Sequence, residues 1–308
     1  MPDNPLAYYP GCSGLGTSAE YDMSTRGVCS ALHIILADIP DWNCCGSSPA
    51  HMVDHSLAAA LSARNLAQAE DNGLTDIVTP CPSCLKNLKT AAQCMQDPAR
   101  GPKAAALLGR SLKQRHRIRS VLQVLAEDMP EGALAAKLKK PLTGLQLVPY
   151  YGCLLTRPAD LMAFDDTENP TSMDRLLEAA GAAVLPFPHK VDCCGASMAI
   201  PKNEAVTRLS GRILDAAVAA GADVVAVACP LCQMNLDLRQ GQINRANSTR
   251  HNIPVMYFTQ LLGIALGLPE KDLGLEKLSV DPRPMLAAVA ARTAASATTT
   301  TAKTEGAA

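Results

Sequence analysis

The sequence is short of aromatic residues, balanced in charge and without a long apolar run. Phe, Trp and Tyr make up 3% of the 308 residues, so we expect a core of aliphatic side chains. The 28 Lys and Arg residues are matched by 29 Asp and Glu residues. A chain without a basic excess lacks the field that holds nucleic acid or an anionic membrane, and we expect neither as a partner.

The most apolar stretch, VMYFTQLLGIALGL at 255–268, is interrupted by Thr259 and Gln260. It is too short to cross a bilayer, which takes a helix of about 20 residues, and it predicts a buried or interface helix. The first residues, MPDNPLAYYP, have neither the basic nor the apolar segment of a secretory signal. We therefore predict a cytoplasmic protein with no membrane span.

Cysteine, in contrast, is plentiful, with 12 residues in the chain. A chain of this length buries enough apolar surface to fold without covalent links between its segments. In a reducing compartment so many thiols are typical of metal ligands or redox groups, and a disulfide framework is the less favoured alternative.

The chain contains a tandem repeat, which is the first feature that decides its architecture. At an offset of 148 residues, LSARNLAQAEDNGLTDIVTPCPSC (61–84) matches LSGRILDAAVAAGADVVAVACPLC (209–232), both cysteines included. Upstream, YYPGC at 8–12 corresponds to YYGC at 150–153, and DWNCCGSS at 41–48 corresponds to KVDCCGAS at 190–197.

Each copy has the same order of local patterns: helical periodicity, a glycine where the helix ends, a β-branched run and a cysteine pair. In the second copy Gly221 ends the helix and DVVAVAC (223–229) is the strand. Strands that alternate with helices predict βαβ units and small, mainly parallel sheets, with functional loops at the carboxyl ends of strands. We therefore predict an α/β protein with two related halves.

The repeat also predicts how the chain is divided. Residues 1–98 would form the first cysteine-rich domain and 146–285 the second, with a helical connector at 99–145 between them. The connector carries a basic run, KQRHRIRSVLQVLAED, which predicts either a solvated face or a docking surface for an acidic partner. Residues 286–308 are rich in Ala and Thr without a packing pattern, and we expect them to be disordered.

Each copy contributes five cysteines in the same order: a single thiol, an adjacent pair and a Cys-Pro-x-Cys motif. The first set is Cys12, Cys44, Cys45, Cys81 and Cys84, and the second set is Cys153, Cys193, Cys194, Cys229 and Cys232. Five thiols are one more than a tetrahedral zinc ion or a four-cysteine iron–sulfur cluster needs.

The spacing within each set favours a centre larger than one ion. Adjacent side chains such as Cys44 and Cys45 point in different directions, so both reach one site only if it wraps around the turn that Gly46 permits. A Cys-x-x-Cys motif at a strand end lets two thiolates point into one pocket. We predict a multinuclear metal cluster in each half, with zinc in one or both sites as the alternative.

The order of single cysteine, CCG and Cys-Pro-x-Cys resembles the cysteine-rich CCG domain, and two copies in one chain resemble the B-type subunit of heterodisulfide reductase. The matching motifs are YYPGC, DWNCCG, YYGCLL, DDTENPTSMDRLLEAAGA, DCCGAS and ACPLCQMNLDLRQ. This resemblance implies two pseudo-twofold-related CCG domains, each holding a noncubane [4Fe-4S] cluster with its five cysteines. It also implies that the cluster loops face each other at the domain interface, across a disulfide substrate.

The implied function is reductive cleavage of a disulfide to two thiols, with one electron from each cluster. Family members in methanogens reduce the mixed disulfide of coenzymes M and B, with electrons that pass through two partners, one with cubane iron–sulfur clusters and one with flavin. This chain has neither a cubane C-x2-C-x2-C-x3-C run nor a dinucleotide-binding glycine fingerprint, so similar partners are implied. Two alternatives stay open: electron transfer within another oxidoreductase complex, or the same site oxidising thiols or a sulfur carrier.

Four residues beside the CCG motifs are candidates for catalytic proton donors. His51 and His55 follow the first motif, and His189 and Lys190 precede the second. Structural hydrogen bonding is the alternative for each of them. Cys29 and Cys94 fall outside both sets and predict buried, free thiols.

Overall fold

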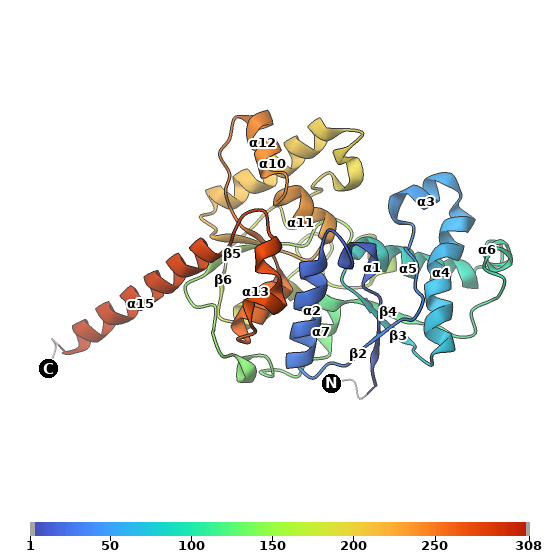
Figure 1. The fold of residues 1–308 in the computed structure, drawn as a ribbon, viewed down its shortest axis with the longest axis horizontal. Helices are drawn as coiled ribbons and strands as arrows, with labels where there is room; N and C mark the ends of the chain where they lie inside the picture. The colour runs from blue at the N-terminus through green and yellow to red at the C-terminus, as the bar shows by residue number, and fades with distance from the viewer. Residues whose placement is uncertain (1–3, 306–308) are drawn as a thin grey trace.

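Eight short strands form two four-stranded sheets in which all neighbouring strands are parallel. The computed structural model describes residues 4–305, and the side chains as far as residue 295. The strands are β1 Leu6–Tyr8, β2 Leu36–Asp38, β3 Asp76–Thr79, β4 Arg117–Ser120, β5 Gln146–Tyr150, β6 Ala183–Val184, β7 Val224–Val227 and β8 Val255–Tyr257. Their orders, β2-β1-β3-β4 and β6-β5-β7-β8, are the same topology twice, as the repeat predicts (Figure 1).

The inner strands have the sequences of sheets that are covered on both faces. All four residues of β7, VVAV, are buried, and so are the last three of the four residues of β3, DIVT. Continuous apolar runs of this kind are typical of parallel strands with helices on either side. These strands hold the cysteine loops that follow them on a rigid support.

The helices of the two halves correspond in order along the chain. In the first half they are α1 Gly11–Gly14, α2 Ala19–Ala31, α3 Ser47–Val53, α4 His55–Asp71, α5 Pro82–Gln96, α6 Gly101–Leu108, α7 Val121–Glu127 and the short η1 Ala135–Lys137. In the second half they are α8 Ala159–Met162, α9 Ser172–Ala179, η2 Ala196–Ala199, α10 Asn203–Ala219, α11 Pro230–Leu236, α12 Gln240–Asn247, α13 Phe258–Ala265, α14 Glu270–Leu273, η3 Leu275–Lys277 and α15 Arg283–Glu305.

The two halves pack on each other through equivalent pairs of helices. Helix α2 lies against α13 (Figure 1), and α7 lies against α9. Helices α2 and α9 are equivalent, because each precedes the second strand of its half in chain order, β2 or β6. Helices α7 and α13 are also equivalent, because each follows the last strand of its half, β4 or β8. The two helix contacts are therefore related by a pseudo-twofold axis. The buried hydroxyls of Ser24 on α2 and Thr259 on α13 are hydrogen-bonded at 2.7 Å. One continuous core of buried side chains runs through both halves.

The connector at 99–145 is less helical than the sequence predicts. It contains α6 and α7, but Arg117–Ser120 forms β4, which pairs with β3 and completes the first sheet. The prediction of a helical connector is wrong for this segment, because RIRS alternates over too few residues to signal a strand. Arg119 on this edge strand is only 2% exposed, since its guanidinium contacts Asp76 at 2.8 Å and Asp128 at 2.7 Å.

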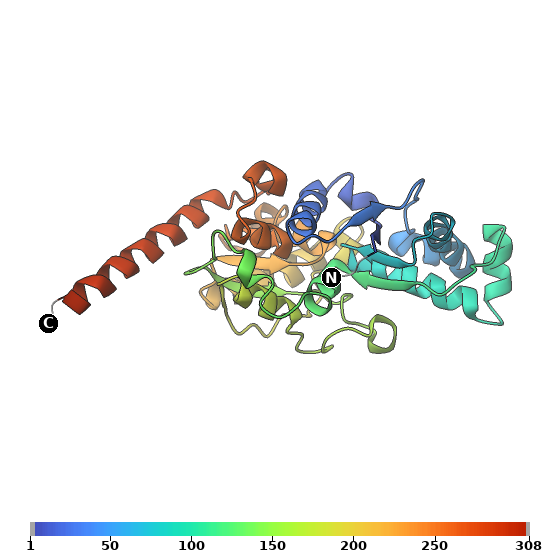
Figure 2. The same ribbon diagram turned by 90° about the horizontal axis from the view of Figure 1, so that it is seen from below.

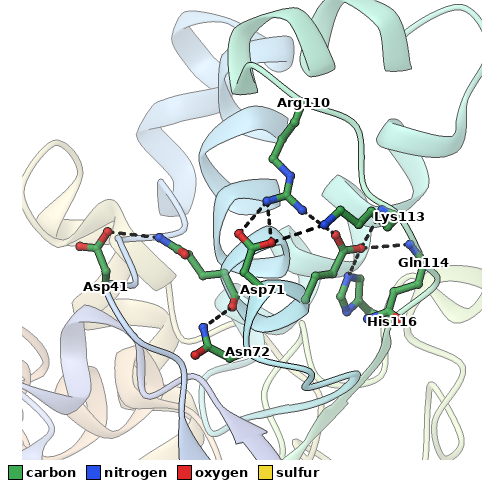
Figure 3. Close-up of polar contacts among 9 residues, drawn as sticks. Asp41, Asp71, Asn72, Arg110, Lys113, Gln114 and His116 are labelled. Atoms are coloured by element: carbon green, nitrogen blue, oxygen red, sulfur yellow. Dashed lines mark hydrogen bonds and ion pairs between the residues drawn. The ribbon is translucent and has the colours of Figure 1, made fainter.

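The basic run of the connector is bound to carboxylates of the first half (Figure 3). The side chain of Glu70, near the end of α4, is 2% exposed and accepts hydrogen bonds from the backbone N–H groups of Lys113 (2.9 Å) and Gln114 (3.0 Å). It also contacts the Nε2 atom of His116 at 3.2 Å and the guanidinium of Arg110 at 3.1 Å. The backbone of this part of the run is therefore held by Glu70, while the side chains of Lys113, Arg115 and Arg117 stay exposed, as a solvated face requires.

The apolar segment at 255–268 forms β8 and then α13, and both are buried. The interface helix that the sequence predicts is confirmed, with a short strand in front of it. Within residues 4–305, no helix is both long enough and apolar enough to cross a bilayer.

The carboxyl-terminal stretch differs from its prediction. Helix α15 runs from Arg283 to Glu305, where we expected disorder from residue 286, and it extends away from both sheets (Figures 1 and 2). Alanine has the highest intrinsic helix propensity, a property that a search for a packing pattern overlooks. Near the start of α15, Val289 is buried and Arg292 pairs with Asp223 at 2.7 Å. Residues 306–308 of the predicted tail lie outside the described residues.

Replacing Glu70 should loosen the connector. Glu70→Ala leaves two backbone N–H groups, the guanidinium of Arg110 and the imidazole of His116 without their shared acceptor, and we expect the free energy of unfolding to fall by about 2–3 kcal/mol. Urea denaturation measures this loss. Glu131→Ala, at an exposed position of the same connector, is the control and should change stability by less than about 0.5 kcal/mol. Equal losses in the two variants would contradict the role of Glu70 as a clamp.

Candidate functional site

The two sets of cysteines lie on loops at the carboxyl ends of strands. Cys12 is on α1 directly after β1, the pair Cys44 and Cys45 follows β2, and Cys81 and Cys84 lie at the start of α5 after β3. Because these three strands are parallel neighbours, their carboxyl ends meet at one edge of the sheet. The second set occupies the same positions after β5, β6 and β7.

Within the first set the sulfur atoms approach one another in pairs. The Sγ atoms of Cys12 and Cys44 are 3.7 Å apart, and those of Cys45 and Cys84 are 3.5 Å apart. The thiols of Cys81 and Cys84 share a hydrogen bond, which joins the fifth member to the set. All five cysteines that the sequence predicts for this half are therefore gathered in one place.

The second set repeats this arrangement. The Sγ atoms of Cys194 and Cys232 are 3.7 Å apart. Cys232 also shares a hydrogen bond with Cys229, and Cys153 shares one with Cys193. The backbone N–H of Gly195 donates to the Sγ atom of Cys193 at 3.3 Å. The structure thus brings together all ten predicted cysteines, five in each half.

Each set has a buried side and an open side. In the first set Cys12 and Cys44 are exposed, while the remaining three are buried. In the second set Cys193 is exposed and Cys153 is partly exposed, while the remaining three are buried. The open positions are equivalent in the two halves, so a molecule from solvent meets the same two thiols of each motif.

Glycines next to the cysteines keep space open around the sulfurs. Gly11 and Gly152, which precede the single cysteine of each set, both have φ +71°, a value that disfavours other residues. A Cβ atom on Gly11 would lie 3.0 Å from the Sγ atom of Cys84, and one on Gly152 would lie 2.8 Å from that of Cys232. The backbone therefore approaches the buried sulfurs more closely than a side chain would allow.

One asparagine in each half donates to the second cysteine of the CCG motif, and the sequence prediction missed both. The Nδ2 atom of Asn87 lies 3.5 Å from the Sγ atom of Cys45, and Nδ2 of Asn235 lies 3.4 Å from Sγ of Cys194. The two asparagines are 148 residues apart, the offset of the repeat. Comparison of the copies for three more residues beyond Cys84 would have found them.

Two serines support the same turns from the other side. Ser62 Oγ donates to the backbone carbonyl of Cys45 at 2.9 Å, and Ser210 Oγ donates to that of Cys194, also at 2.9 Å. Ser62 and Ser210 are among the positions that match in the repeat. Their hydroxyls hold the CCG turns on helices α4 and α10.

Tyrosines pack against both sets, although the low aromatic content predicts an aliphatic core. All six tyrosines of the chain are at most 2% exposed. The hydroxyl of Tyr9 donates to the carbonyl of Asn43 at 2.8 Å, and that of Tyr150 donates to the carbonyl of Asp192 at 2.6 Å. Both carbonyls belong to the residue before the CCG motif. Burial, and then the nearby thiolates, raise the pKa of Tyr9 and Tyr150, so both phenols stay protonated.

One tyrosine connects the two sets across the domain interface. Tyr21 of α2 donates to the carbonyl of Ala228, the residue before Cys229, at 3.3 Å. Its ring stacks on Tyr257 of the second half at a centroid distance of 4.0 Å. Burial raises the pKa of Tyr21, and so does its proximity to Cys229 and Cys81. The Cys-Pro-x-Cys loops of the two halves thus lie on either side of one aromatic residue.

The thiols of each set divide into proton donors and acceptors. A hydrogen bond from Cys84 lowers the pKa of Cys45 to about 6, and one from Cys153 lowers the pKa of Cys193 to about 6. The same bonds raise the pKa of Cys84 and Cys153. Near pH 7 each set therefore holds thiolates beside thiols, and metal binding would release the remaining protons.

The two candidate proton donors of the second half have different surroundings. The Nδ1 atom of His189 is 2.7 Å from Oδ2 of Asp192, the residue next to Cys193. Lys190 is buried, its ammonium paired with Asp174 and donating to the carbonyl of Pro170 at 2.9 Å. A buried ion pair of this kind favours a structural role for Lys190.

The two histidines of the first half lie apart from their set. The rings of His51 and His55 are parallel, with centroids 6.4 Å apart, and they line a surface cavity together with Asn87 and Cys94. No cysteine of the first set lines this cavity. Cys94 and Cys29 are buried and free, as predicted.

The donor atoms fit a metal that prefers sulfur. Each set offers five thiols and no carboxylate, and soft thiolate ligands select iron–sulfur clusters, zinc or copper(I). Among the side chains that the structure describes, as far as residue 295, no three of Cys, His, Asp or Glu converge on a point where one ion could bind.

A family model described as "Cysteine-rich domain" (CCG) matches the chain twice, at residues 6–89 and 148–237. Both matches contain all five cysteines of one set. They also include Asn87 and Asn235, and so the two supporting amides lie inside the shared domain.

Relatives match almost the whole chain. The 8-methylmenaquinol:fumarate reductase membrane anchor subunit of Wolinella succinogenes is 34% identical over 90% of this chain and 97% of its own length. The B-type subunit of the ferredoxin:CoB-CoM heterodisulfide reductase of Methanosarcina mazei is 30% identical over 93% of this chain and 97% of its own length. A protein of Archaeoglobus profundus that is named as similar to the same B-type subunit is 27% identical over 86% of this chain and 92% of its own length.

Among solved structures, a hypothetical protein from Helicobacter pylori has the same fold. It superposes on 91% of this chain and 53% of its own with a TM-score of 0.73, at 14% sequence identity. At this identity the likeness extends to the fold alone.

A methyl group on Gly152 should damage the second site selectively. Gly152→Ala brings a Cβ to 2.8 Å from the Sγ atom of Cys232, whereas Gly221→Ala, at a similar positive φ, meets no atom within 4 Å. Both variants bear a backbone cost of roughly 1–2 kcal/mol. We expect only Gly152→Ala to lose about half of the metal that the purified protein binds. Equal metal content in the two variants would show that the close approach is irrelevant to binding.

The two exposed thiols of the CCG motifs should differ in reactivity in metal-free protein. The pKa of Cys193 is about 6, whereas burial raises that of Cys44 to about 11. Alkylation of Cys193 by iodoacetamide should be constant above about pH 7 and slow below pH 6, while that of Cys44 rises about tenfold per pH unit. Peptide mass spectrometry resolves the two rates. Cys153→Ala removes the hydrogen bond and should shift the Cys193 profile upward; an unchanged profile would contradict its cause.

Proposed function

Because the chain belongs to the family of B-type heterodisulfide reductase subunits, with two CCG cysteine-rich domains, we propose that it is the disulfide-cleaving iron–sulfur component of an oxidoreductase complex. The observation that carries the proposal is the complete, twofold repetition of the site. Both halves have five thiols, the same exposed pair, the same supporting asparagine and the same close backbone approach.

The ten cysteines would hold two noncubane [4Fe-4S] clusters, one in each half. Such clusters supply single electrons and iron atoms that bind thiolate sulfur. The three buried thiols of each set fix its position, and the tyrosines against them exclude water. Asn87 and Asn235 orient the second CCG cysteine through its sulfur.

Two equivalent sites fit the stoichiometry of the reaction. Cleavage of R–S–S–R′ to RSH and R′SH breaks one sulfur–sulfur bond and consumes two electrons and two protons. With one site for each sulfur atom, each half handles one electron and one thiolate. The exposed thiols Cys12 and Cys44, with Cys153 and Cys193 in the second half, mark the sides from which the disulfide would approach.

His189 is the proposed proton donor for the second half. Its Nδ1–H donates to the carboxylate of Asp192, which leaves Nε2 as the atom that exchanges a proton. We propose no such role for Lys190, whose ammonium is already shared between Asp174 and a carbonyl. His51 and His55 could act as proton donors only by way of Asn87, which lines their cavity and contacts Cys45, because no cysteine of the first set lines that cavity.

Electrons would come from partner subunits. The chain lacks the motifs of cubane clusters and of dinucleotide binding, so we propose a C-type partner with cubane iron–sulfur clusters and an A-type partner with flavin. The relative from Methanosarcina mazei carries ferredoxin and CoB-CoM heterodisulfide in its name, which supports a low-molecular-weight disulfide as substrate here. The cytoplasmic location stays a prediction.

A second candidate function is favoured by the 34% identity to the membrane anchor subunit of an 8-methylmenaquinol:fumarate reductase. On this proposal the same two clusters pass electrons between a quinol and a partner, and no disulfide is cleaved. The oxidising direction, from thiols or a sulfur carrier to a disulfide, uses the same atoms and is set by the relative reduction potentials.

Anaerobic purification followed by an activity assay separates these functions. We expect about eight irons per chain, and oxidation of reduced methyl viologen when disulfides of small thiols are added. Cys193→Ser should lower this activity at least about 100-fold, because it removes an exposed thiol of one set. Cys29→Ala, at a buried cysteine outside both sets, is the control and should keep the activity.

Each remaining outcome points to another function. Eight irons with electron transfer to a quinone analogue, but no disulfide cleavage, would support the electron-transfer function instead. Zinc without iron would overturn the redox proposal altogether.

A further inference from the structure

A cavity of about 380 Å³ opens on the surface of the first half, beside but outside the first cysteine set. It lies between α3, α4 and α5. Its lining residues fall into two groups, a polar rim and an apolar floor. The rim includes His51, His55, Lys86, Asn87, Thr90 and Arg100, and the floor includes Ala58, Ala59, Ala91 and Cys94.

The rim is cationic and contains no carboxylate. Lys86 makes no ion pair with any described residue. Of the two carboxylates nearest in sequence, Asp54 caps α4 and pairs with Lys103 at 3.2 Å, outside the lining, whereas Asp97 pairs with Arg100 of the rim at 2.8 Å. Two imidazoles, an ammonium and a hydroxyl thus face one space without an acidic side chain to neutralise them.

The cavity touches the cysteine set only through Asn87. The Nδ2 atom of this residue is occupied by Cys45 and by the carbonyl of Ser47, at 3.1 Å. Its side chain therefore separates the cavity from the buried side of the set, away from the exposed thiols Cys12 and Cys44. A ligand in the cavity would not compete for the cysteines.

The second half has a cavity of about 540 Å³ at the corresponding place, with a different lining. At the repeat offset of 148, Ala91 corresponds to Arg239, whose Nε donates to Oδ1 of Asn235 at 3.2 Å. Arg239 also lines the corresponding cavity of the second half, together with Ala199 and Asn203, the counterparts of His51 and His55. With alanine in place of arginine, no side chain of the first half makes this contact with Asn87, which lines the cavity itself.

We propose that the cavity of the first half is a binding site for a small oxyanion, a phosphate or dicarboxylate group. Its negative oxygens would accept hydrogen bonds from His51, His55 and Lys86, as cationic and imidazole donors favour. A short apolar stem would lie on the alanine floor. No role in disulfide cleavage is required, so the proposal does not depend on the metal content of the cysteine sets.

Calorimetric titration of the anaerobically purified full chain tests the site. Inorganic phosphate and malonate are added separately at pH 6.5, and we expect at least one of them to bind saturably. Lys86→Ala should weaken the binding about tenfold. Ala91→Leu should abolish it, because the larger apolar side chain fills the floor of the cavity without adding a hydrogen-bond donor.

The matched control is Arg245→Ala, which removes a cation from the corresponding cavity of the second half. It should leave the binding to the first half unchanged. Binding that is lost in Arg245→Ala but kept in Ala91→Leu, or no saturable binding of either anion, would overturn the proposal. Thr90→Val, a nearly isosteric change at an exposed position, is the second test if Ala91→Leu does not fold. It should weaken the binding, and unchanged binding would contradict the placement of the anion.

Discussion

The structure depends on one constraint: five sulfur atoms from three loops have to reach the same place. Parallel strands meet this constraint because their carboxyl ends lie at one edge of the sheet. Close to the buried sulfurs the backbone passes at glycine, at Gly11 and Gly152 with φ +71°, where a side chain would not fit. An asparagine side chain then fixes the innermost turn by donating to sulfur and carbonyl together. The short strands and paired helices serve to hold these few atoms in position.

Duplication gives each half the same solution, but the two halves are not independent. Helices of one half pack on helices of the other, and one core runs through both halves. The symmetry is broken where the supports differ. Tyr21 of the first half donates a hydrogen bond to the second Cys-Pro-x-Cys loop. Within the second half, Lys190 and Asp174 form a buried ion pair, and the hydroxyl of Tyr151 donates to Asp174. The two metal sites would therefore have distinct surroundings, as a substrate with two different ends would require.

The sequence contains the repeat, the parallel α/β topology and the grouping of the cysteines, because glycine and cysteine positions repeat at nearly constant offsets. Strand β4 could not be recognised, since its arginines are buried only through Asp76 and Asp128, which lie elsewhere in the chain. The tyrosines beside the cysteines were missed for a different reason: composition counts aromatic residues but does not say that all six tyrosines are buried or that Tyr9 and Tyr150 hold the CCG turns. The helix of α15 was missed because intrinsic propensity leaves no amphipathic pattern. Contacts between distant segments thus explain most of what the sequence did not predict.

The division of each set into buried and exposed thiols decides which cysteines are oxidised first. An oxidant arriving from solvent reaches Cys12, Cys44 and Cys193 first, and thiolate character makes Cys193 the most susceptible of them. Damage would begin on the side that faces solvent, while the buried sulfurs keep their place in the core. Because sulfenic acids and disulfides at exposed positions are reversible, a small thiol could restore the outer ligands and leave the inner scaffold untouched.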